Sequence, residues 1–247
     1  MENMLLIGLS RQIALGRELD VIANNVANSA TNGFKARSTR FAEFLGPVAR
    51  AETFTPADRK VSFVVDKGTP LDLSGGAIER TNNPLDAAIK GDAFFEIQTS
   101  GGVRFTRDGA FEINAKGELV TQAGNIVNGQ NGPIRFSPSE TGIRIAEDGS
   151  VFSDQGQRGK LKLMTFADAR ALKNEGANIF SSSTPAIAAP PTTQLSSGSL
   201  ERSNVRPVLE MSRLVEVQRA YSSIAGLIGR TDELRRTAIQ RLAEVPA

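Results

Sequence analysis

The chain has 247 residues, of which 40% are hydrophobic, with 29 basic and 27 acidic side chains and a formal net charge of +2. It contains no cysteine, histidine or tryptophan, which excludes disulfide bonds, thiolate metal sites and nucleophiles activated by an imidazole base. Because the two signs of charge are interleaved along the chain, a nucleic-acid groove, which needs clustered cations, is disfavoured.

The first residues, MENMLLIGLS, do not resemble a secretory signal peptide. They have an acidic second residue, a short apolar run and no small-residue cleavage site. No run of about 18 apolar residues, as a membrane-spanning helix requires, occurs in the chain.

The N-terminal segment is predicted to form an amphipathic helix from about Met4 to Ser29. Leu6, Leu9 and Ile13 are spaced three and four residues apart, which is the helical period. The same spacing recurs on a slightly rotated stripe that contains Leu15, Leu19, Ile22 and Val26.

The middle of the chain is predicted to be an antiparallel β domain, because short apolar segments alternate with turn signals. Asp108-Gly109 and Asp148-Gly149 are predicted tight turns, and Gly101-Gly102 is a further break. The predicted strands are Phe94–Ile97, Val103–Phe105, Phe111–Ile113, Leu119–Thr121, Ile134–Phe136, Ile143–Ile145, Val151–Ser153 and Leu161–Phe166.

Two segments that flank the β domain are predicted to be extended connections without core residues. They are residues 36–75 and the low-complexity stretch 181–203, which contains SSSTPAIAAPPTTQLSSGS. The β domain is accordingly expected over residues 76–180.

The C-terminal segment is predicted to form a longer helix from Pro207 to Leu242. Proline is suited to the first turn, and Ser203 or Asn204 is a candidate cap. A heptad-like seam follows the alternating spacing of three and four and contains Leu214, Val217, Tyr221, Ile224 and Ile228.

An α+β fold follows from this order, with an inserted, mainly antiparallel β domain and an antiparallel pair of terminal helices over residues 1–35 and 204–247. A second stripe on the C-terminal helix, Val208, Met211 and Val215, would lie open to water in a monomer. The stripe continues through Ser222, Ala225, Gly226 and Gly229, where two helix-interior glycines favour close approach by a neighbouring helix. The alternative is that the glycines kink or fray the helix and that all apolar residues pack within one chain.

Three blocks in this order resemble the bacterial flagellar axial protein family of rod and hook subunits. ANNVANSATNGFK is similar to its N-terminal signature, and NPLDAAIKGDAFFEIQTSGGVRFTRDGAFEINAKGELVTQAGNIV to its central β domain. LERSNVRPVLEMSRLVEVQRAY is similar to its C-terminal helix. Within the basal-body rod proteins, the shortness of the chain and the absence of a Leu-Tyr-Gln element after the first block are most similar to the proximal rod members.

The resemblance implies a structural subunit of the proximal rod that polymerises through its terminal helices into the axial tube, which transmits torque and houses the export channel. It implies export by the flagellar secretion apparatus without a cleaved signal peptide, and a place in the periplasmic rod of the basal body. The partners expected are other copies of the chain, other rod proteins and the export apparatus, with no nucleic acid, no small-molecule substrate, no cofactor, no metal and no catalysis. A distal rod or hook-family subunit is the alternative within the family.

The four asparagines of the signature admit two interpretations. They can bond backbone groups that the helix end leaves unpaired, with Gly33 in the left-handed conformation that turns the chain outward. Alternatively, Asn24, Asn25 and Asn28 bond to adjacent subunits without introducing charge. The residues expected at the subunit interface are Leu9, Ile13, Leu19, Ile22, Asn24, Asn25, Val26, Asn28, Gly33, Phe34, Met211, Leu214, Val217, Gln218, Tyr221, Ile224, Ala225 and Ile228.

Two functions of other classes are also considered. A carbohydrate-active enzyme would need two carboxylates about 5–10 Å apart in a cleft, for which Asp92, Glu96, Asp108 and Glu112 are the candidates. Asp92 and Asp108 are better explained by turns, and Glu96 and Glu112 by solvent-facing strand positions. A periplasmic β-rich binding module would account for the middle of the chain and leave the helical ends unexplained.

Overall fold

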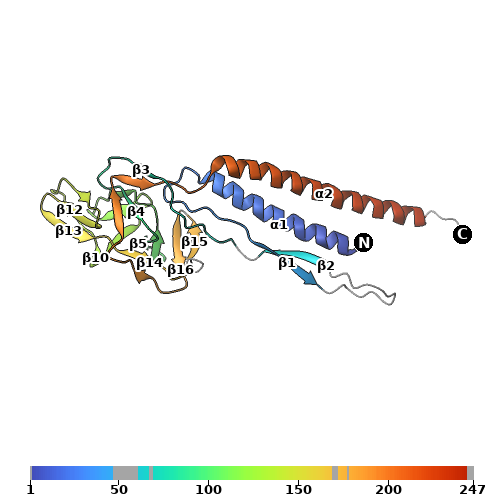
Figure 1. The fold of residues 1–247 in the computed structure, drawn as a ribbon, viewed down its shortest axis with the longest axis horizontal. Helices are drawn as coiled ribbons and strands as arrows, with labels where there is room; N and C mark the ends of the chain where they lie inside the picture. Colours follow the sequence, from blue (N-terminus) through green and yellow to red (C-terminus); the bar gives the residue numbers. More distant parts are fainter. Residues whose placement is uncertain (1, 47–60, 67–68, 169–171, 177, 244–247) are drawn as a thin grey trace. The chain divides into compact units, whose positions relative to one another are not determined.

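The computed structural model describes residues 2–46, 61–66, 69–168, 172–176 and 178–243. The chain divides into two compact units, of which unit 1 comprises residues 1–26, 37–70 and 207–247, and unit 2 comprises 27–36 and 71–206. Two helices and a mainly antiparallel β region confirm the predicted α+β class (Figure 1).

Unit 1 is built on the helices α1 (Glu2–Ala27) and α2 (Pro207–Ala243), whose bounds lie within two residues of the predicted ones. The pair is antiparallel, because Gly8 near the start of α1 lies against Ile228, whereas Glu18 near its end binds Arg213 (Figure 1). None of the described helices combines the length and apolar character needed to cross a bilayer.

The helix seam is narrow. Ala14, Ile22 and Val217 are buried, and Leu15, Leu19 and the rest of the predicted α2 seam are half-buried. The seam therefore uses one face of each helix and leaves the other faces of the pair without cover.

Unit 1 also contains a hairpin that the sequence analysis did not predict. Strands β1 (Phe41–Gly46) and β2 (Val61–Asp66) pair antiparallel over their full length. The expectation of a purely extended segment over residues 36–75 is therefore wrong for these two stretches, whose aromatic and β-branched residues favour strands. Residues 47–60 and 67–68 of that segment lie outside the described residues.

Unit 2 is built from sheets in which every pair of strands is antiparallel. The largest sheet has the strand order β15-β16-β6-β5-β9-β8-β7, with β10 beside β9 and β14 joining β5 to β17. Smaller sheets pair β11-β12-β13, β18-β4 and β19-β3. In chain order the strands are β3 (Ile78–Arg80), β4 (Ala87–Lys90), β5 (Phe94–Thr99), β6 (Gly102–Thr106), β7 (Phe111–Ile113), β8 (Leu119–Thr121), β9 (Ile126–Gly129), β10 (Gly132–Pro133), β11 (Arg144–Ile145), β12 (Ser150–Ser153), β13 (Gly156–Lys160), β14 (Leu163–Thr165), β15 (Leu172–Gly176), β16 (Ile179–Ser182), β17 (Ile187–Ala188), β18 (Gln194–Ser197) and β19 (Ser199–Glu201).

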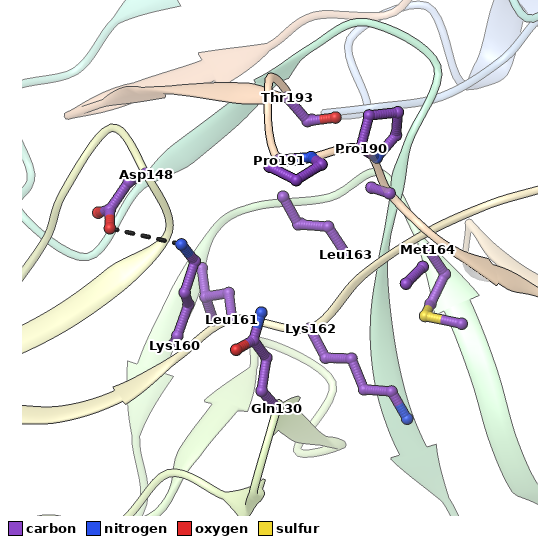
Figure 2. A pocket seen from close by; sticks show the side chains of 12 residues that line it. Gln130, Asp148, Lys160, Leu161, Lys162, Leu163, Met164, Pro190, Pro191 and Thr193 are labelled. Atoms are coloured by element: carbon purple, nitrogen blue, oxygen red, sulfur yellow. Dashed lines mark hydrogen bonds and ion pairs between the residues drawn. The ribbon is translucent and has the colours of Figure 1, made fainter.

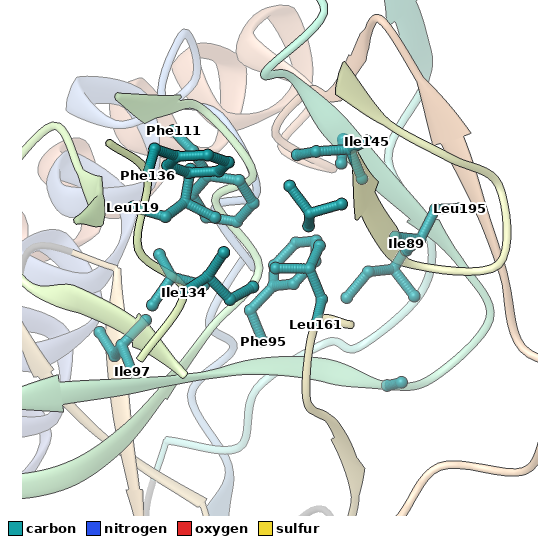
Figure 3. Packing of buried hydrophobic residues seen from close by; sticks show 14 residues of the cluster. Ile89, Phe95, Ile97, Phe111, Leu119, Ile134, Phe136, Ile145, Leu161 and Leu195 are labelled. Carbon is teal, nitrogen blue, oxygen red and sulfur yellow. The ribbon is translucent and has the colours of Figure 1, made fainter. Parts of the chain in front are cut away.

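Two hydrophobic cores hold unit 2 together. In the larger one, Phe95 and Phe111 meet edge to face with ring centroids 5.0 Å apart, surrounded by aliphatic side chains such as Leu161 (Figure 3). In the smaller one, Phe94 makes a similar contact with Phe180 at 5.6 Å. These contacts give unit 2 a fully buried interior.

The low-complexity segment 181–203 belongs to this fold, so the expectation that it holds no core residues is wrong. Strand β18 pairs with β4, and its Leu195 is completely buried in the larger core (Figure 3). Strand β19 pairs with β3, and Leu200 is 8% exposed. In β18 the single apolar residue, Leu195, is buried between more exposed polar residues, whereas all three residues of β19 are buried.

Two local expectations are also corrected. Gly109 does not form a hairpin turn; a Cβ there would lie 1.7 Å from the carbonyl oxygen of Ala87, so glycine allows a close backbone approach. The predicted strand Ile134–Phe136 is not a strand. Ile134 and Phe136 are nevertheless buried, and their backbones bond to Leu119 and Gly117.

Candidate assembly interface

Helix α1 exposes an apolar stripe on the side away from α2. Leu6, Leu9 and Ile13 are 51%, 50% and 53% exposed. At about 100° per residue, this stripe lies roughly 140° around the helix from the stripe of Leu15, Leu19, Ile22 and Val26, so the expectation of only a slight rotation is wrong. One face of α1 thus packs within the chain, and a second apolar face is left to water.

Helix α2 exposes the second stripe that the sequence analysis predicted. Val208, Met211 and Val215 are 76%, 54% and 47% exposed. Further along this face, a Cβ added at Gly226 or Gly229 would have no atom within 4 Å. This side of the helix is therefore apolar at one end and unusually flat at the other.

A third apolar stripe on α2 was missed by the sequence analysis. Leu209, Leu227 and Leu234 are 58%, 58% and 70% exposed, and the helical period places them on one side. The three stripes of α2 are roughly 100–130° apart around the helix axis. The wide spacing of these leucines hides the stripe from a local periodicity count.

The predicted interface residues fall into three groups by exposure. Leu9, Ile13, Asn24, Met211 and Gln218 are exposed, while Ile22, Asn25, Gly33, Phe34 and Val217 are buried within the chain. The third group is half-buried and comprises Leu19, Val26, Asn28, Leu214, Tyr221, Ile224, Ala225 and Ile228. For all three groups, contact with a second subunit stays a prediction.

Asn25 is engaged inside unit 1. Its Nδ2 donates to the carbonyl oxygen of Arg37 at 2.8 Å, and its Oδ1 accepts the Arg37 backbone N–H at 3.0 Å. The same Nδ2 lies 3.3 Å from a carboxylate oxygen of Glu210 on α2. The capping interpretation is therefore wrong for Asn25, because its side chain bonds the backbone of Arg37, twelve residues further on, and not groups at the end of α1.

Gly33 has the predicted left-handed conformation, with φ of 64°. It does not end the helix, since α1 stops at Ala27. A Cβ at Gly33 would lie 2.6 Å from the carbonyl carbon of Arg107, so the position needs glycine for space as well as for φ.

Behind this turn lies a buried ion cluster in unit 2. The Lys35 ammonium donates to a Glu201 carboxylate oxygen at 2.7 Å, and Arg107 Nη1 lies 3.4 Å from the other oxygen. Side-chain exposure is 1% for both cations and 2% for Glu201. Burial lowers the pKa of Lys35, and the hydrogen bond to Glu201 opposes that change.

The remaining groups of the cluster come from distant parts of unit 2. Lys35 also donates to the carbonyl oxygen of Ser74 at 2.7 Å, and Glu201 accepts the backbone N–H of Gly76 at 2.9 Å. The Arg107 guanidinium stacks over the ring of Phe94 at 4.7 Å. Two cations thus share one carboxylate in a region shielded from solvent.

Asn204 was a candidate helix cap and has a different role. Its Oδ1 accepts the backbone N–H of Ala36 at 2.7 Å, and its Nδ2 donates to the carbonyl oxygen of Asp72 at 2.8 Å.

The sequence analysis did not predict the ion cluster of Lys35, Glu201 and Arg107. Lys35 and Glu201 have opposite charges and lie in the first and third of the blocks that resemble the family. Their positions in the sequence do not indicate that they form an ion pair.

Two cavities in unit 2 test the alternative of an enzyme. One, of about 350 Å³, is lined by apolar side chains with Lys160 and Lys162, and Lys160 binds Asp148 at 3.5 Å (Figure 2). Lys162 binds Glu96 at 2.9 Å. The other, of about 310 Å³, has Asp92 in its lining. Neither is lined by two of the four candidate carboxylates. Among the described residues, no three His, Cys, Asp or Glu side chains are grouped as metal ligands would be.

The other candidates have structural contacts or face solvent. Asp108 accepts the backbone N–H of Ala110 at 3.1 Å, and burial raises the pKa of Asp108. Glu96 also accepts the Asn128 amide at 3.1 Å, and Glu112 is exposed. Among the described residues, the four candidate carboxylates thus do not form a pair across either of these two cavities.

Comparison with known proteins gives matches along most of the chain. Family models match residues 5–35 (flagella basal body rod protein), 88–153 (flagellar hook protein FlgE/F/G D1 domain) and 196–241 (flagellar basal body rod FlgEFG protein C-terminal). The flagellar basal-body rod protein FlgF of Caulobacter vibrioides is 38% identical over 99% of this chain and 100% of its own. FlgF of Mesorhizobium japonicum is 35% identical, with 98% of each chain covered, and FlgG of Bacillus subtilis is 31% identical, with 92% and 94% covered.

Proposed function

The chain belongs to the flagellar basal-body rod protein family and is a structural subunit of the rod, and we propose that it polymerises through the exposed apolar stripes of α1 and α2. It assembles with other flagellar rod proteins at the basal body. In the proposal, each exposed stripe packs against a terminal helix of another rod subunit, and that subunit is a second copy of this chain.

The observation that carries the proposal is the distribution of apolar side chains around the helices. Helix α1 has apolar stripes on two sides and α2 on three, and the α1–α2 seam covers one of each. A two-helix unit in water needs a single apolar stripe per helix. Helices apolar on several sides are typical of elements that lie between neighbours.

The energetic argument favours association. If about 400 Å² of apolar surface per chain is buried between subunits, the gain is on the order of 10 kcal/mol before the costs of association and ordering. Arginine, glutamate and aspartate are interspersed on α2 without forming a block of one sign. Close packing of neighbouring helices therefore does not concentrate like charge.

We place the subunit in the proximal, periplasmic part of the rod, on the shortness of the chain and the missing Leu-Tyr-Gln element. A distal rod position is the second candidate. We further propose export by the flagellar apparatus without a cleaved signal peptide. The proposed role is structural and includes no catalysis and no small-molecule substrate.

A complementation experiment tests the proposal. A strain lacking the gene should form rods that stop before the distal segment. The variant Met211→Glu with Val215→Glu should fold and be exported, but should restore less than about a tenth of swimming, because a carboxylate buried between helices costs several kcal/mol.

The matched control is Ser212→Glu with Arg219→Gln, which changes the charge of the same helix by the same amount outside the exposed stripes. It should restore swimming and complete rods. Full restoration by the Met211 and Val215 variant would contradict assembly through this stripe, whereas rods of normal length in the deletion strain would contradict the proximal position alone.

A further inference from the structure

We infer that residues 27–36, the second half of the N-terminal signature, are a fixed part of unit 2, locked by the Lys35–Glu201–Arg107 cluster before any contact between subunits forms. The inference concerns this segment and not the two helices of unit 1. It does not depend on the proposed function, because every contact that supports it lies within one chain.

Backbone hydrogen bonds dock the segment on two sides. The Gly33 N–H donates to the carbonyl oxygen of Glu201 at 2.6 Å, which adds the segment beside the end of β19. On the other side, the Asp72 N–H donates to the carbonyl oxygen of Ala36 at 2.8 Å. The segment is therefore hydrogen-bonded on both sides to stretches of the chain that are distant in sequence.

Side chains hold the turn that precedes these bonds. Asn178 donates to the carbonyl oxygen of Asn32 at 2.6 Å, and Arg202 donates to its side-chain oxygen at 3.2 Å. Phe34, two residues on, is 4% exposed. The turn is thus fixed by residues of unit 2 and not by a neighbouring molecule.

The ion cluster makes the docking specific. With two cations and one carboxylate, the buried cluster carries a net charge of +1 in the native chain. Removing Glu201 leaves two buried cations without the carboxylate that both of them contact, whereas removing Lys35 leaves Arg107 paired with Glu201. Because an uncompensated buried charge is strongly destabilising, replacing Glu201 should destabilise the segment more than replacing Lys35. In an exposed ion pair, replacing either partner would have a similarly small effect.

The consequence is that the chain reaches an assembly site with this segment already placed. The Asn32-Gly33 turn and the segment up to Ala36 are set by unit 2 in each subunit. Buried Gly33 and Phe34, expected at a subunit interface, then act by shaping the subunit itself.

Hydrogen exchange on the full-length chain, at a concentration where it is monomeric, tests the inference. The amides of Gly33 and Ala36 should exchange as slowly as that of Ile97 in β5, with protection at least a thousandfold above an unstructured peptide. If Gly33 and Ala36 exchange at the peptide rate while Ile97 stays protected, the inference is overturned.

Two variants and one control test the lock. Glu201→Gln should speed exchange at Gly33 and Ala36 at least tenfold and lower the thermal midpoint of unit 2 by roughly 10 °C, and Lys35→Met should have a smaller effect on both. The control, Lys160→Met, removes the partly exposed pair with Asp148 and should change neither. If Glu201→Gln behaves like the control, the cluster does not lock the segment; if it does not fold, the wild-type exchange and Lys35→Met still decide.

Discussion

A single amide side chain directs the chain where it leaves the first helix. Asn25 both donates to and accepts from the backbone of Arg37, at 2.8 and 3.0 Å, as a neighbouring β-strand would. Aspartate has no amide donor and leucine has neither group, so only a carboxamide of this length satisfies both backbone atoms. The exposure of the Asn25 side chain is correspondingly low, at 1% for the residue.

Glu140 gives unit 2 a pH-dependent contact. Burial acts to raise its pKa, but hydrogen bonds from the Ser137 backbone, Ser153 and Arg158 outweigh it and hold the pKa at about 2. Because the folded pKa lies below the unfolded value of 4.5, the contact stabilises the fold above about pH 4.5 and is lost as the pH falls toward 2.

We therefore expect Glu140→Gln to lower the thermal midpoint of unit 2 at pH 6 and to leave it almost unchanged at pH 2. The difference in thermal midpoint between variant and wild type, measured by circular dichroism, should decrease to almost zero as the pH is lowered from 6 to 2. The control is Glu112→Gln at an exposed position, which should stay close to wild type. A Glu140→Gln difference that is constant across the range would contradict the assignment.

At the scale of elements, the surroundings of Gly226 and Gly229 help to decide why α2 contains two glycines. They either allow close approach by a neighbouring helix or kink or fray α2. Gly226 and Gly229 lie inside one continuous helix, with open space where a side chain would be. Alanine at either position should therefore stabilise the monomeric helix by about 1 kcal/mol. The monomer gives no packing reason for two glycines here, which favours close approach by a neighbour over packing within one chain.

The test is Gly226→Leu compared with Asp232→Leu, which places the same side chain at an exposed position about 120° around the helix. Gly226→Leu should raise helicity in the monomer and reduce polymer formation at least tenfold, as measured by sedimentation, because the added side chain separates the helices. Asp232→Leu should polymerise like wild type. Normal polymerisation of Gly226→Leu would leave kinking or fraying as the explanation of the glycines.

At the scale of the whole molecule, the two units differ in how their interiors are closed. Both described core clusters lie in unit 2, whereas unit 1 buries one narrow seam. Tyr221 is the single tyrosine of a chain without tryptophan, and it lies on α2 close to Gly16 of α1. Its fluorescence therefore reports on unit 1 alone.

On heating a dilute solution, the Tyr221 fluorescence should change at a lower temperature than the β-sheet circular dichroism of unit 2. A hundredfold higher protein concentration should raise the tyrosine midpoint by at least about 5 °C and leave the β midpoint in place, because association stabilises only the unit that forms the contact. One shared, concentration-independent transition would show that unit 1 is complete without neighbours.

The sequence predicted the elements whose signal is local. Helical spacing defined α1 and α2 to within two residues, and β7 and β8 coincide with their predicted ranges. The exposed stripe of Val208, Met211 and Val215 was also predicted, since the face of a helix follows from its period. The hairpin β1–β2 was missed, and strands β18 and β19 were missed because their partners, β4 and β3, lie far away in the chain.

By itself, the sequence determined the family, the two helices and the excess of apolar surface on them, because each depends on residues within a few turns of one another. Only the tertiary structure decided that Lys35, Arg107 and Glu201 form one buried cluster and that residues 27–36 belong to unit 2. The physical reason is that a buried charge is stable only beside its counter-charge. Which residues become neighbours across a hundred positions is a property of the packed chain and not of any local pattern.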